Sequence, residues 1–420
     1  MSTARFEPAS NRGTRDLSGL FIALASVLVG FGIVMVHSAS ITSWPTQFER
    51  VYLSRHLLFV CLGLVVAITC AMIPARVWLK QAPLLLTGTI ILLVAVLIPG
   101  VGTRVKGAQR WLRFGGFSLQ PSELAKIALP LMACRVLLWK PQERMSLKEF
   151  IAVLIPPGLV IPLVLPEPDL GTSLFLITSY AIALFIAGWP LRYFVGGVIL
   201  VIPAAISLVA LRPYQLRRIT GFLDTWTSID SAPWQLKQSL LTLGAGGLMG
   251  TGPGQGSQKL SYLPEANTDF VFAVVGEELG LMGTLTLVIV WCALFLTGLK
   301  LLSGAVFQAR AVGTALLSQL GLQAAINVAV VTAVVPPKGI AHPLLSYGGS
   351  NLITSLAAIG IILSMAKCRT EEPGESGPGQ SKQTRAIRIP RDGMAGVDMI
   401  VETAETDPHG NDAPIDAEED

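Results

Sequence analysis

Long apolar runs constrain this sequence more than any other feature. Each approaches or exceeds the roughly 20 residues that a helix needs to cross a bilayer. Hydrophobic residues make up 52% of the chain and charged residues only 14%, against about 25% charged residues in soluble domains. We therefore expect an all-α polytopic membrane protein of about ten transmembrane helices, at about residues 17–37, 54–73, 82–99, 121–138, 149–165, 170–188, 193–211, 270–302, 309–335 and 342–366.

The apolar runs divide the chain into three parts. Residues 1–16 are polar, and residues 17–369 hold all the runs. Residues 370–420 are rich in Pro, Gly and acidic residues and lack aromatics, and the part after Thr370 has a net charge of −9. We expect a cytoplasmic N-terminal segment, one membrane domain and a disordered acidic cytoplasmic tail.

Loop charges indicate the orientation. The short connections that carry Arg76, Lys148 and Arg310 share a side with both termini, so the positive-inside rule places that side in the cytoplasm. Residues 212–268 then form a large extracytoplasmic loop between the seventh and eighth helices. The outer loops also carry many cations, Lys259 among them, which we interpret as binding something anionic.

Three acidic residues gather where the eighth apolar run begins. Ionisable groups beside a bilayer are costly, so they are functional candidates by default. Asp269 could cap the helix or act as a general base that takes a proton from a hydroxyl nucleophile, and the two roles can coexist. Glu277 lies about 80° further round the helix and could lean toward the same cavity. Glu278, at about 180°, should face elsewhere and be structural.

A second group of candidates begins in the loop before the fourth run. Arg110, Trp111 and Arg113 could form an interfacial belt or a lipid-headgroup site, with arginine on phosphate and tryptophan on a sugar face. Glu123 and Lys126 are three residues apart, so they share a helix face and can pair. Such a pair is most often structural and lines a polar cavity.

Two other stretches are unusual for membrane helices. Residues 336–350 bring turn formers and hydroxyls, with Lys338 and Ser346, into an apolar region, which predicts a broken or re-entrant helix lining a site. Residues 244–257 are rich in glycine but lack the ending of a phosphate loop, so a mobile loop or an anion-binding nest is expected. The five cysteines show no metal-ligand spacing, and no metal site is expected.

Taken together, these stretches resemble the SEDS family (shape, elongation, division and sporulation) of membrane peptidoglycan glycosyltransferases. The resemblance rests on residues 107–126, 168–173, 259–283 and 337–350, in the family's order, and is greatest to its division branch. It implies ten membrane helices and polymerisation of lipid II outside the cytoplasmic membrane. Asp269 matches the family's essential aspartate and Trp111 an important tryptophan, whereas Asn267, His342 and Asn351 depart from the pattern.

We therefore expect an enzyme that polymerises lipid II during cell division, with Asp269 as its catalytic residue. We expect no tightly bound cofactor, although Mg²⁺ or Mn²⁺ could neutralise the diphosphate. The expected partners are lipid II, a class B penicillin-binding protein transpeptidase, other division proteins and the membrane at the septum, and no nucleic acid. The residues expected to bind substrate are Arg110, Trp111, Arg113, Glu123, Lys126, Lys259, Glu277, Lys338 and Ser346.

Two alternatives of other classes stay open. A transporter that moves the lipid-linked precursor across the bilayer would also use Glu123, Lys126 and broken helices, but it would need polar groups continuous to both faces. Dense polar residues occur toward one side only, which favours the enzyme. A non-catalytic division scaffold would instead depend on the acidic tail and would tolerate Asp269→Ala.

Overall fold

The computed structural model describes residues 9–40, 48–105, 108–114, 117–137, 146–167, 170–210, 213–257 and 263–369. The chain divides into two units, residues 1–370 and residues 371–420. The second unit, and with it the predicted disordered tail, lies outside the described residues.

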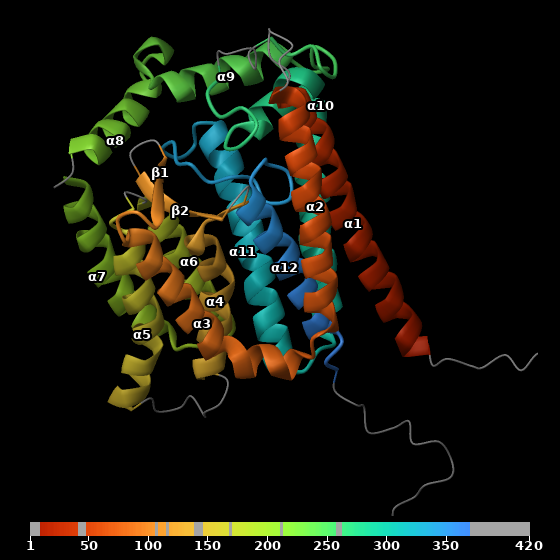
Figure 1. Cartoon of the computed structure of the whole chain (residues 1–420), viewed down its shortest axis with the longest axis vertical. Coiled ribbons are helices and arrows are strands. Elements are labelled where there is room, and N and C mark those ends of the chain that lie inside the picture. Colours follow the sequence, from red (N-terminus) through yellow and green to blue (C-terminus); the bar gives the residue numbers. More distant parts are fainter. Residues whose placement is uncertain are drawn as a thin grey trace, which may run out of the picture. The chain divides into compact units, whose positions relative to one another are not determined.

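Among the described residues, ten helices of 17 residues or more each coincide with one of the ten predicted runs (Figure 1). Within the described residues seven of them are long and apolar enough to cross a bilayer, and α6 is a shorter apolar helix. The chain is therefore a polytopic membrane protein, as predicted. The helices are α1 (Ala9–Ser40), α2 (Phe48–Met72), α3 (Ala75–Leu97), α4 (Pro121–Leu137), α5 (Leu147–Val164), α6 (Leu170–Ile186), α7 (Leu191–Ala210), α10 (Val271–Ser303), α11 (Phe307–Val331) and α12 (Gly349–Ala366).

The remaining elements lie in the two long connections. Between α7 and α10, helices α8 (Pro213–Thr225) and α9 (Trp234–Gly246) flank a 3₁₀ turn, Ile229–Ser231, and cross one end of the bundle (Figure 1). Between α3 and α4, strands β1 (Gly102–Val105), β2 (Ala108–Phe114) and β3 (Phe117–Leu119) form an antiparallel sheet in the order β1-β2-β3. The sequence had not predicted this sheet.

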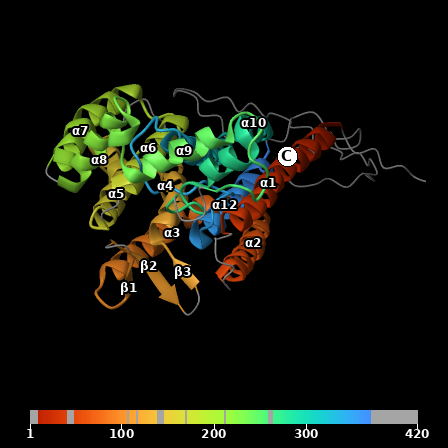
Figure 2. The ribbon, with the colours of Figure 1, turned by 90° about the horizontal axis from the view of Figure 1, so that it is seen from above.

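Helix α12 forms the centre of the bundle, where it packs against α2, α11 and α4 (Figure 2). Nearly all its side chains are buried, whereas α2 leaves Val65 and Ile68 exposed on its outer face. Small residues allow such close packing inside a membrane: a Cβ on Gly360 would lie 2.2 Å from the carbonyl oxygen of Ala67 in α2. Polar residues at the start of α12 therefore lie inside the protein, away from lipid.

Residues 332–348 interrupt the last apolar region, as their prolines and glycines predicted. Helix α11 ends at Val331, and α12 begins only at Gly349 instead of at residue 342. Ala333 and Leu344 have positive φ angles in this stretch, and Leu345 is fully buried. Irregular backbone at membrane depth is tolerated where protein buries it or where it lines a cavity. We refer to residues 332–348 as the re-entrant loop.

Candidate active site

Asp269 lies two residues before α10, in a turn at the end of the long connection. The N-cap position of α10 is Phe270, and no side chain caps the helix there. The structure thus gives no support to Asp269 as the cap. The turn is tight, because Glu265 has a φ of 57° and its carbonyl oxygen accepts the N–H groups of Thr268 and Phe270 at 3.1 and 3.2 Å.

Three hydrogen bonds connect the Asp269 segment to the re-entrant loop, two of them through Asn327 of α11. The buried Nδ2 group of Asn327 in α11 donates to the carbonyl oxygens of Asp269 and Ile340, both at 2.8 Å. The N–H of Tyr347 donates to the carbonyl oxygen of Asn267 at 2.8 Å. On the Asp269 segment these bonds use backbone carbonyl oxygens, which fix where Asp269 lies.

The carboxylate of Asp269 lies against Gly339 of the re-entrant loop. A Cβ on Gly339 would come within 3.0 Å of Asp269 Oδ2, so a larger residue would crowd the carboxylate. Asp269 and Lys338, which precedes Gly339, are both half-buried. The structure therefore brings two predicted site residues, Asp269 and Lys338, from separate parts of the chain to neighbouring positions.

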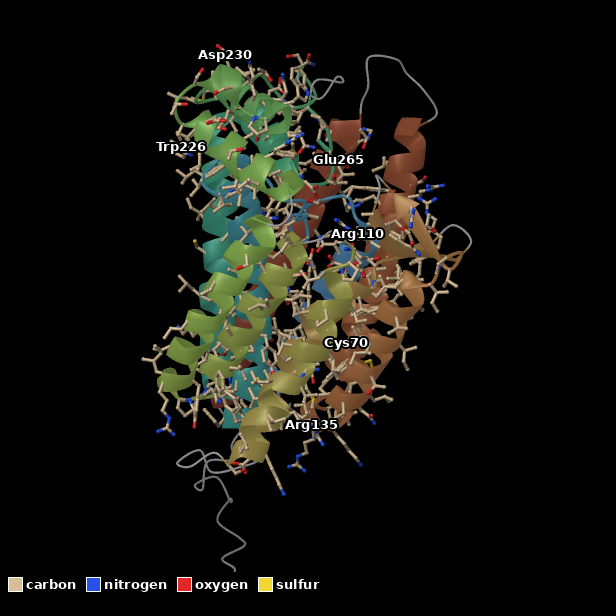
Figure 3. The ribbon with its side chains drawn as sticks, turned by 90° about the vertical axis from the view of Figure 1, so that its left-hand side faces the viewer. Cys70, Arg110, Arg135, Trp226, Asp230 and Glu265 are labelled. Carbon is tan, nitrogen blue, oxygen red and sulfur yellow. The ribbon has the colours of Figure 1, made fainter. Side chains whose placement is uncertain are left out.

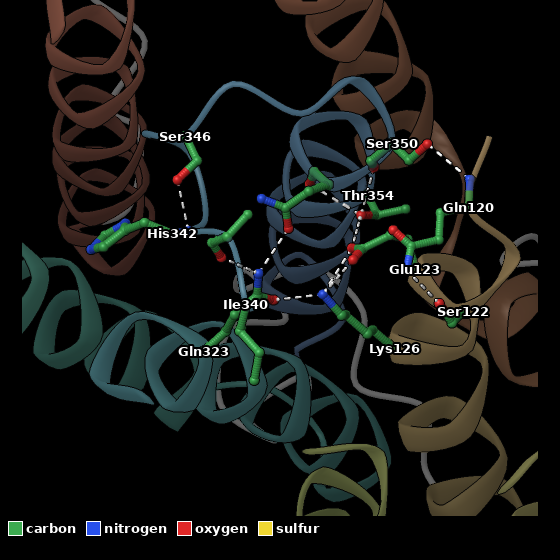
Figure 4. A network of polar contacts seen from close by, with 12 residues as sticks. Gln120, Ser122, Glu123, Lys126, Gln323, Ile340, His342, Ser346, Ser350 and Thr354 are labelled. Carbon is green, nitrogen blue, oxygen red and sulfur yellow. Dashed lines mark hydrogen bonds and ion pairs between the residues drawn. The ribbon is translucent and has the colours of Figure 1, made fainter. Parts of the chain in front are cut away.

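Glu123 and Lys126 form the predicted ion pair on α4 and begin a buried polar network (Figure 4). Lys126 Nζ donates to both carboxylate oxygens of Glu123, at 2.7 and 2.8 Å, and to Gln323 Oε1 at 3.2 Å. Thr354 of α12 donates to Glu123 Oε2 at 3.3 Å. The pair thus ties α4 to α11 and α12.

Gln323 extends this network to the re-entrant loop. Its Nε2 group donates to the carbonyl oxygen of Ala341 and to Asn351 Oδ1, both at 2.8 Å. Ala341 follows Ile340, whose carbonyl oxygen accepts from Asn327. The network therefore links the Glu123–Lys126 pair to the backbone of Asp269 through two neighbouring residues of one loop.

Ser346 lies inside the re-entrant loop and holds its shape. Its buried hydroxyl accepts the N–H of His342 at 2.8 Å (Figure 4). The ring of His342 faces Trp291 of α10, with centroids 5.6 Å apart, and its Nδ1 lies 3.0 Å from the carbonyl oxygen of Pro343. The described contacts of Ser346 are internal to the loop, and its predicted contact with substrate stays a prediction.

Strand β2 separates the residues that were predicted to form one headgroup site. Successive side chains of a strand point to opposite faces, and Leu112 is buried while Arg113 is exposed. Arg110 therefore lies on the inner face with Leu112, and its Nε donates to the carbonyl oxygen of Glu167 at 2.7 Å. Trp111 and Arg113 lie on the other face, so the three side chains do not form one cluster.

Glu277 and Glu278 are both buried near the start of α10 and bond to the glycine-rich segment. Glu277 Oε1 accepts the N–H of Ser257 at 2.7 Å, and Glu278 Oε2 accepts the N–H of Gly254 at 2.9 Å. The prediction that Glu277 contacts substrate stays a prediction. Glu278 bonds to the same segment as Glu277, so the expectation that it faces elsewhere is wrong. Lys259 lies outside the described residues.

Gln323 and Asn327 belong to the site and were not predicted from the sequence. Both are almost fully buried in α11, and with Gln319 they recur every four residues. That spacing places three amides on one face of an apolar helix, and polar side chains in membrane helices usually bond across to other helices. This periodic signal was available and would have found them.

The labelled residues in Figure 3 show which side chains lie at each end of the helix bundle. Glu265, Trp226 and Asp230 lie toward the end that α8 and α9 cross, and Arg135 lies at the opposite end. Across the described part of the chain, no three His, Cys, Asp or Glu side chains lie close enough together to hold a metal ion. The arrangement thus places the half-buried Asp269, together with Glu265 of the same turn, toward one end of the bundle, and a buried polar network links to its backbone.

This fold and site define a polytopic membrane protein with a supported carboxylate near one face of its helix bundle. The chain belongs to the cell cycle protein family of FtsW, RodA and SpoVE, which it matches over residues 18–371. It is 39% identical over 356 residues to the probable peptidoglycan glycosyltransferase FtsW of Geobacter sp. (strain M18), covering 83% of this chain and 96% of that protein. It is 37% identical over 346 residues to the corresponding Coxiella burnetii protein, covering 81% and 93%.

Solved structures show the same fold. A chain from a peptidoglycan synthase complex that coordinates polymerization and crosslinking superposes with a TM-score of 0.68 at 27% identity, covering 83% of this chain and 96% of that one. The Thermus thermophilus rod shape determining protein RodA superposes with a TM-score of 0.62 at 26% identity, covering 84% and 97%.

Proposed function

We propose that this chain is a peptidoglycan glycosyltransferase, which polymerises lipid II into glycan strands at the outer face of the cytoplasmic membrane during cell division. The observation that carries the proposal is the position of Asp269. Its backbone is bonded to the re-entrant loop through Asn327. The half-buried residue directs its carboxylate at Gly339, which follows Lys338. The names of the family relatives support the same activity.

The proposed reaction needs one base and a stabilised leaving group. The Asp269 carboxylate accepts the proton of the 4-hydroxyl on the acceptor sugar as that oxygen attacks the anomeric carbon of the donor sugar. The bond from this carbon to the diphosphate breaks, and the polyprenyl diphosphate leaves with the bonding electrons. A positioned general base typically contributes about 10²–10⁴-fold to rate.

Cationic side chains would stabilise the diphosphate, which gains negative charge as it leaves. Lys338 is the best placed of those described, because it adjoins the residue that touches Asp269. Arg110, Arg113 and Lys259 are proposed to attract the anionic substrate, and Trp111 to cover a sugar face. The Glu123–Lys126 pair is proposed to form the floor of the site, with Ser346 shaping the loop above it.

A divalent cation fits this site only together with substrate. The described residues offer no three-ligand cluster, and Mg²⁺ is commonly held by one or two carboxylates plus substrate phosphates. Asp269 and Glu265 are the carboxylates of this turn that could share such a cation with the diphosphate. The ion would neutralise charge on the leaving group.

The proposed surroundings follow from orientation and from the related complex. Loop charges support a cytoplasmic position for both termini, which would put the end of the bundle near Glu265 and Asp230 (Figure 3) outside the cytoplasm. The similarity to a chain of a peptidoglycan synthase complex supports a class B penicillin-binding protein transpeptidase as partner. Other division proteins at the septum are proposed on the names of the relatives.

The test is polymerisation of lipid II by purified protein, with and without a class B transpeptidase, read as glycan strands on a gel. Asp269→Asn keeps the shape but cannot accept the proton, so it should insert normally, still bind the transpeptidase and lose at least about 10²-fold in rate. Asp230→Asn is the matched control and should retain the rate.

Three results would contradict the proposal. Polymerisation by Asp269→Asn at close to the wild-type rate would contradict the role of Asp269 as general base. Movement of labelled lipid II across vesicles without glycan synthesis would indicate a transporter. Absence of both activities, with transpeptidase binding intact, would indicate a scaffold.

A further inference from the structure

The segment from residue 247 to residue 257, here called the glycine loop, docks into a break in helix α10. The break is at Gly280, whose φ of 66° and ψ of −163° are not helical. The glycine loop follows α9 directly, and the chain then runs through residues 258–268 to Asp269 and the start of α10. The glycine loop at the start of this segment and Asp269 at its end therefore both lie next to α10.

The loop replaces hydrogen bonds that the break removes from α10. The N–H groups of Leu281 and Met282 would normally donate to the carbonyl oxygens of Glu277 and Glu278. They donate instead to the carbonyl oxygens of Gly247 and Leu248, at 2.9 and 3.3 Å respectively. A break near membrane depth persists only when such freed groups find partners.

The two freed carbonyl oxygens are satisfied by the same loop. The Glu277 carbonyl oxygen accepts the N–H of Thr251 at 2.9 Å, and that of Glu278 accepts the N–H of Gly252 at 3.0 Å. Backbone groups of the loop thus serve both sides of the break.

Two buried carboxylate side chains also accept hydrogen bonds from the glycine loop. Ser257 donates its N–H to Glu277 Oε1 at 2.7 Å, and Gly254 donates its N–H to Glu278 Oε2 at 2.9 Å. Ser38, near the end of α1, donates to the other oxygen of Glu278 at 2.5 Å. Glu277 and Glu278 are 0% and 1% exposed, so water does not compete strongly for these bonds.

Close approach explains the glycines. A Cβ on Gly250 would lie 2.2 Å from the carbonyl oxygen of Glu278, and one on Gly256 would lie 2.7 Å from Glu277 Oε2. The N–H groups of Gly254 and Ser257, which an anion-binding nest would offer to a ligand, bind the chain's own carboxylates. The glycine composition therefore indicates a clamped loop and not a phosphate site.

We propose that Glu277 and Glu278 are positioning residues, which clamp the glycine loop to the first turns of α10 and thereby help to hold Asp269, two residues before that helix, in place. The role rests on the proposed function of Asp269 as general base. Ser257 is held at Glu277 on one side, and Asn327 holds Asp269 on the other. Because both glutamates lie in the helix that begins two residues after Asp269, releasing the clamp should shift Asp269 as well.

The test combines hydrogen exchange with kinetics on the full-length protein in nanodiscs. Glu277→Ala and Glu278→Ala should speed amide exchange in residues 247–257. They should also lower kcat by up to about 10²-fold, the scale of a small misplacement of catalytic groups, with KM for lipid II nearly unchanged. Glu277→Gln keeps an acceptor oxygen for Ser257 and should restore most of the rate.

The matched control is Glu149→Ala, which removes a carboxylate that accepts the N–H of Ser146 at 2.9 Å at the start of α5. It should change neither measurement in the glycine loop nor kcat. If the Glu277 variants do not insert, Ser38→Ala loosens Glu278 without altering α10 and should raise exchange, with a loss of less than about tenfold in kcat.

Unchanged exchange in residues 247–257 would overturn the clamp, and faster exchange with unchanged kcat would overturn the positioning role. Asp269→Asn is measured in parallel: a wild-type rate there contradicts the proposed function, while the exchange data still decide whether the clamp exists. The two failures are therefore distinguishable.

Discussion

Two lysine–carboxylate pairs of almost equal length lie in opposite surroundings. Lys126 and Glu123 are 2.7 Å apart inside the bundle, with side chains 6% and 10% exposed. Lys237 and Asp230 are 2.6 Å apart near α9, with side chains 27% and 83% exposed. Water can replace the partner of an exposed charge, whereas a buried charge that loses its partner stays unsolvated. Burial, not distance, should decide how much each pair matters.

The largest effect is expected from Lys126→Met. This change leaves the Glu123 carboxylate buried without its cation, so the free energy of unfolding in detergent should fall by about 3–5 kcal/mol. Lys148→Met, at an exposed position on α5, is the control and should change it little. If Lys126→Met and Lys148→Met lost equal free energy of unfolding, burial would not decide how much a lysine contributes.

Removing both charges of the buried pair should do less harm than removing one. The double variant Glu123→Leu/Lys126→Met leaves no unpaired charge, and replacing buried pairs by apolar residues is often neutral or stabilising. It should regain most of the stability that Lys126→Met loses in the same unfolding experiment. A double variant less stable than the single one would show that the pair is net stabilising.

A smaller loss is expected from Gln323→Leu, which removes the amide between Lys126, Ala341 and Asn351. Unsatisfied buried polar groups cost about 1–3 kcal/mol, which should appear in the unfolding free energy and as faster proteolysis of the re-entrant loop. Gln319→Leu makes the same change one turn earlier, where no side-chain bond is described, and should be nearly neutral. A similar loss at both positions would contradict this prediction.

The smallest effect is expected from Asp230→Asn at the exposed pair. The hydrogen bond and the charge of Lys237 lower the pKa of Asp230 below its ordinary value. A lowered folded-state pKa stabilises the fold above the unfolded pKa and is lost as pH falls through the folded pKa. The variant should therefore melt only slightly below the wild type at pH 7, because the pair is exposed, and this small difference should vanish under acid conditions, where Asp230 is protonated. A large loss of melting temperature at pH 7 would show that the exposed pair stabilises the fold as much as the buried pair does.

The membrane helices could be predicted closely because the bilayer dictates their length. All ten predicted runs contain a helix, with ends shifted by up to about eight residues. The sheet could not, because residues 100–120 are rich in cations and turn formers that resemble an interfacial loop. Treating them as a loop placed Arg110 and Trp111 together, whereas strand geometry puts them on opposite faces.

The candidate site could be predicted only in part. Asp269 and Lys338 stood out because charges and turn formers are rare among apolar runs. The position of Glu277 was estimated from its angle around α10, which says nothing of what packs there; the glycine loop occupies that side. Gln323 and Asn327 carry no charge, so they stand out less than Asp269 and Lys338, although their spacing places them on one face of α11.

The break at Gly280 also makes the position of the site less sensitive to the thickness of the bilayer. As one straight helix, Val271–Ser303 would be about 50 Å long, well over the roughly 30 Å of hydrocarbon that it crosses. A long apolar helix adapts to a thinner or thicker membrane by changing its tilt. The glycine loop bonds to residues on both sides of the break, from Glu277 to Met282, so a change of tilt would fall on residues 283–303 and leave Asp269 at a constant height.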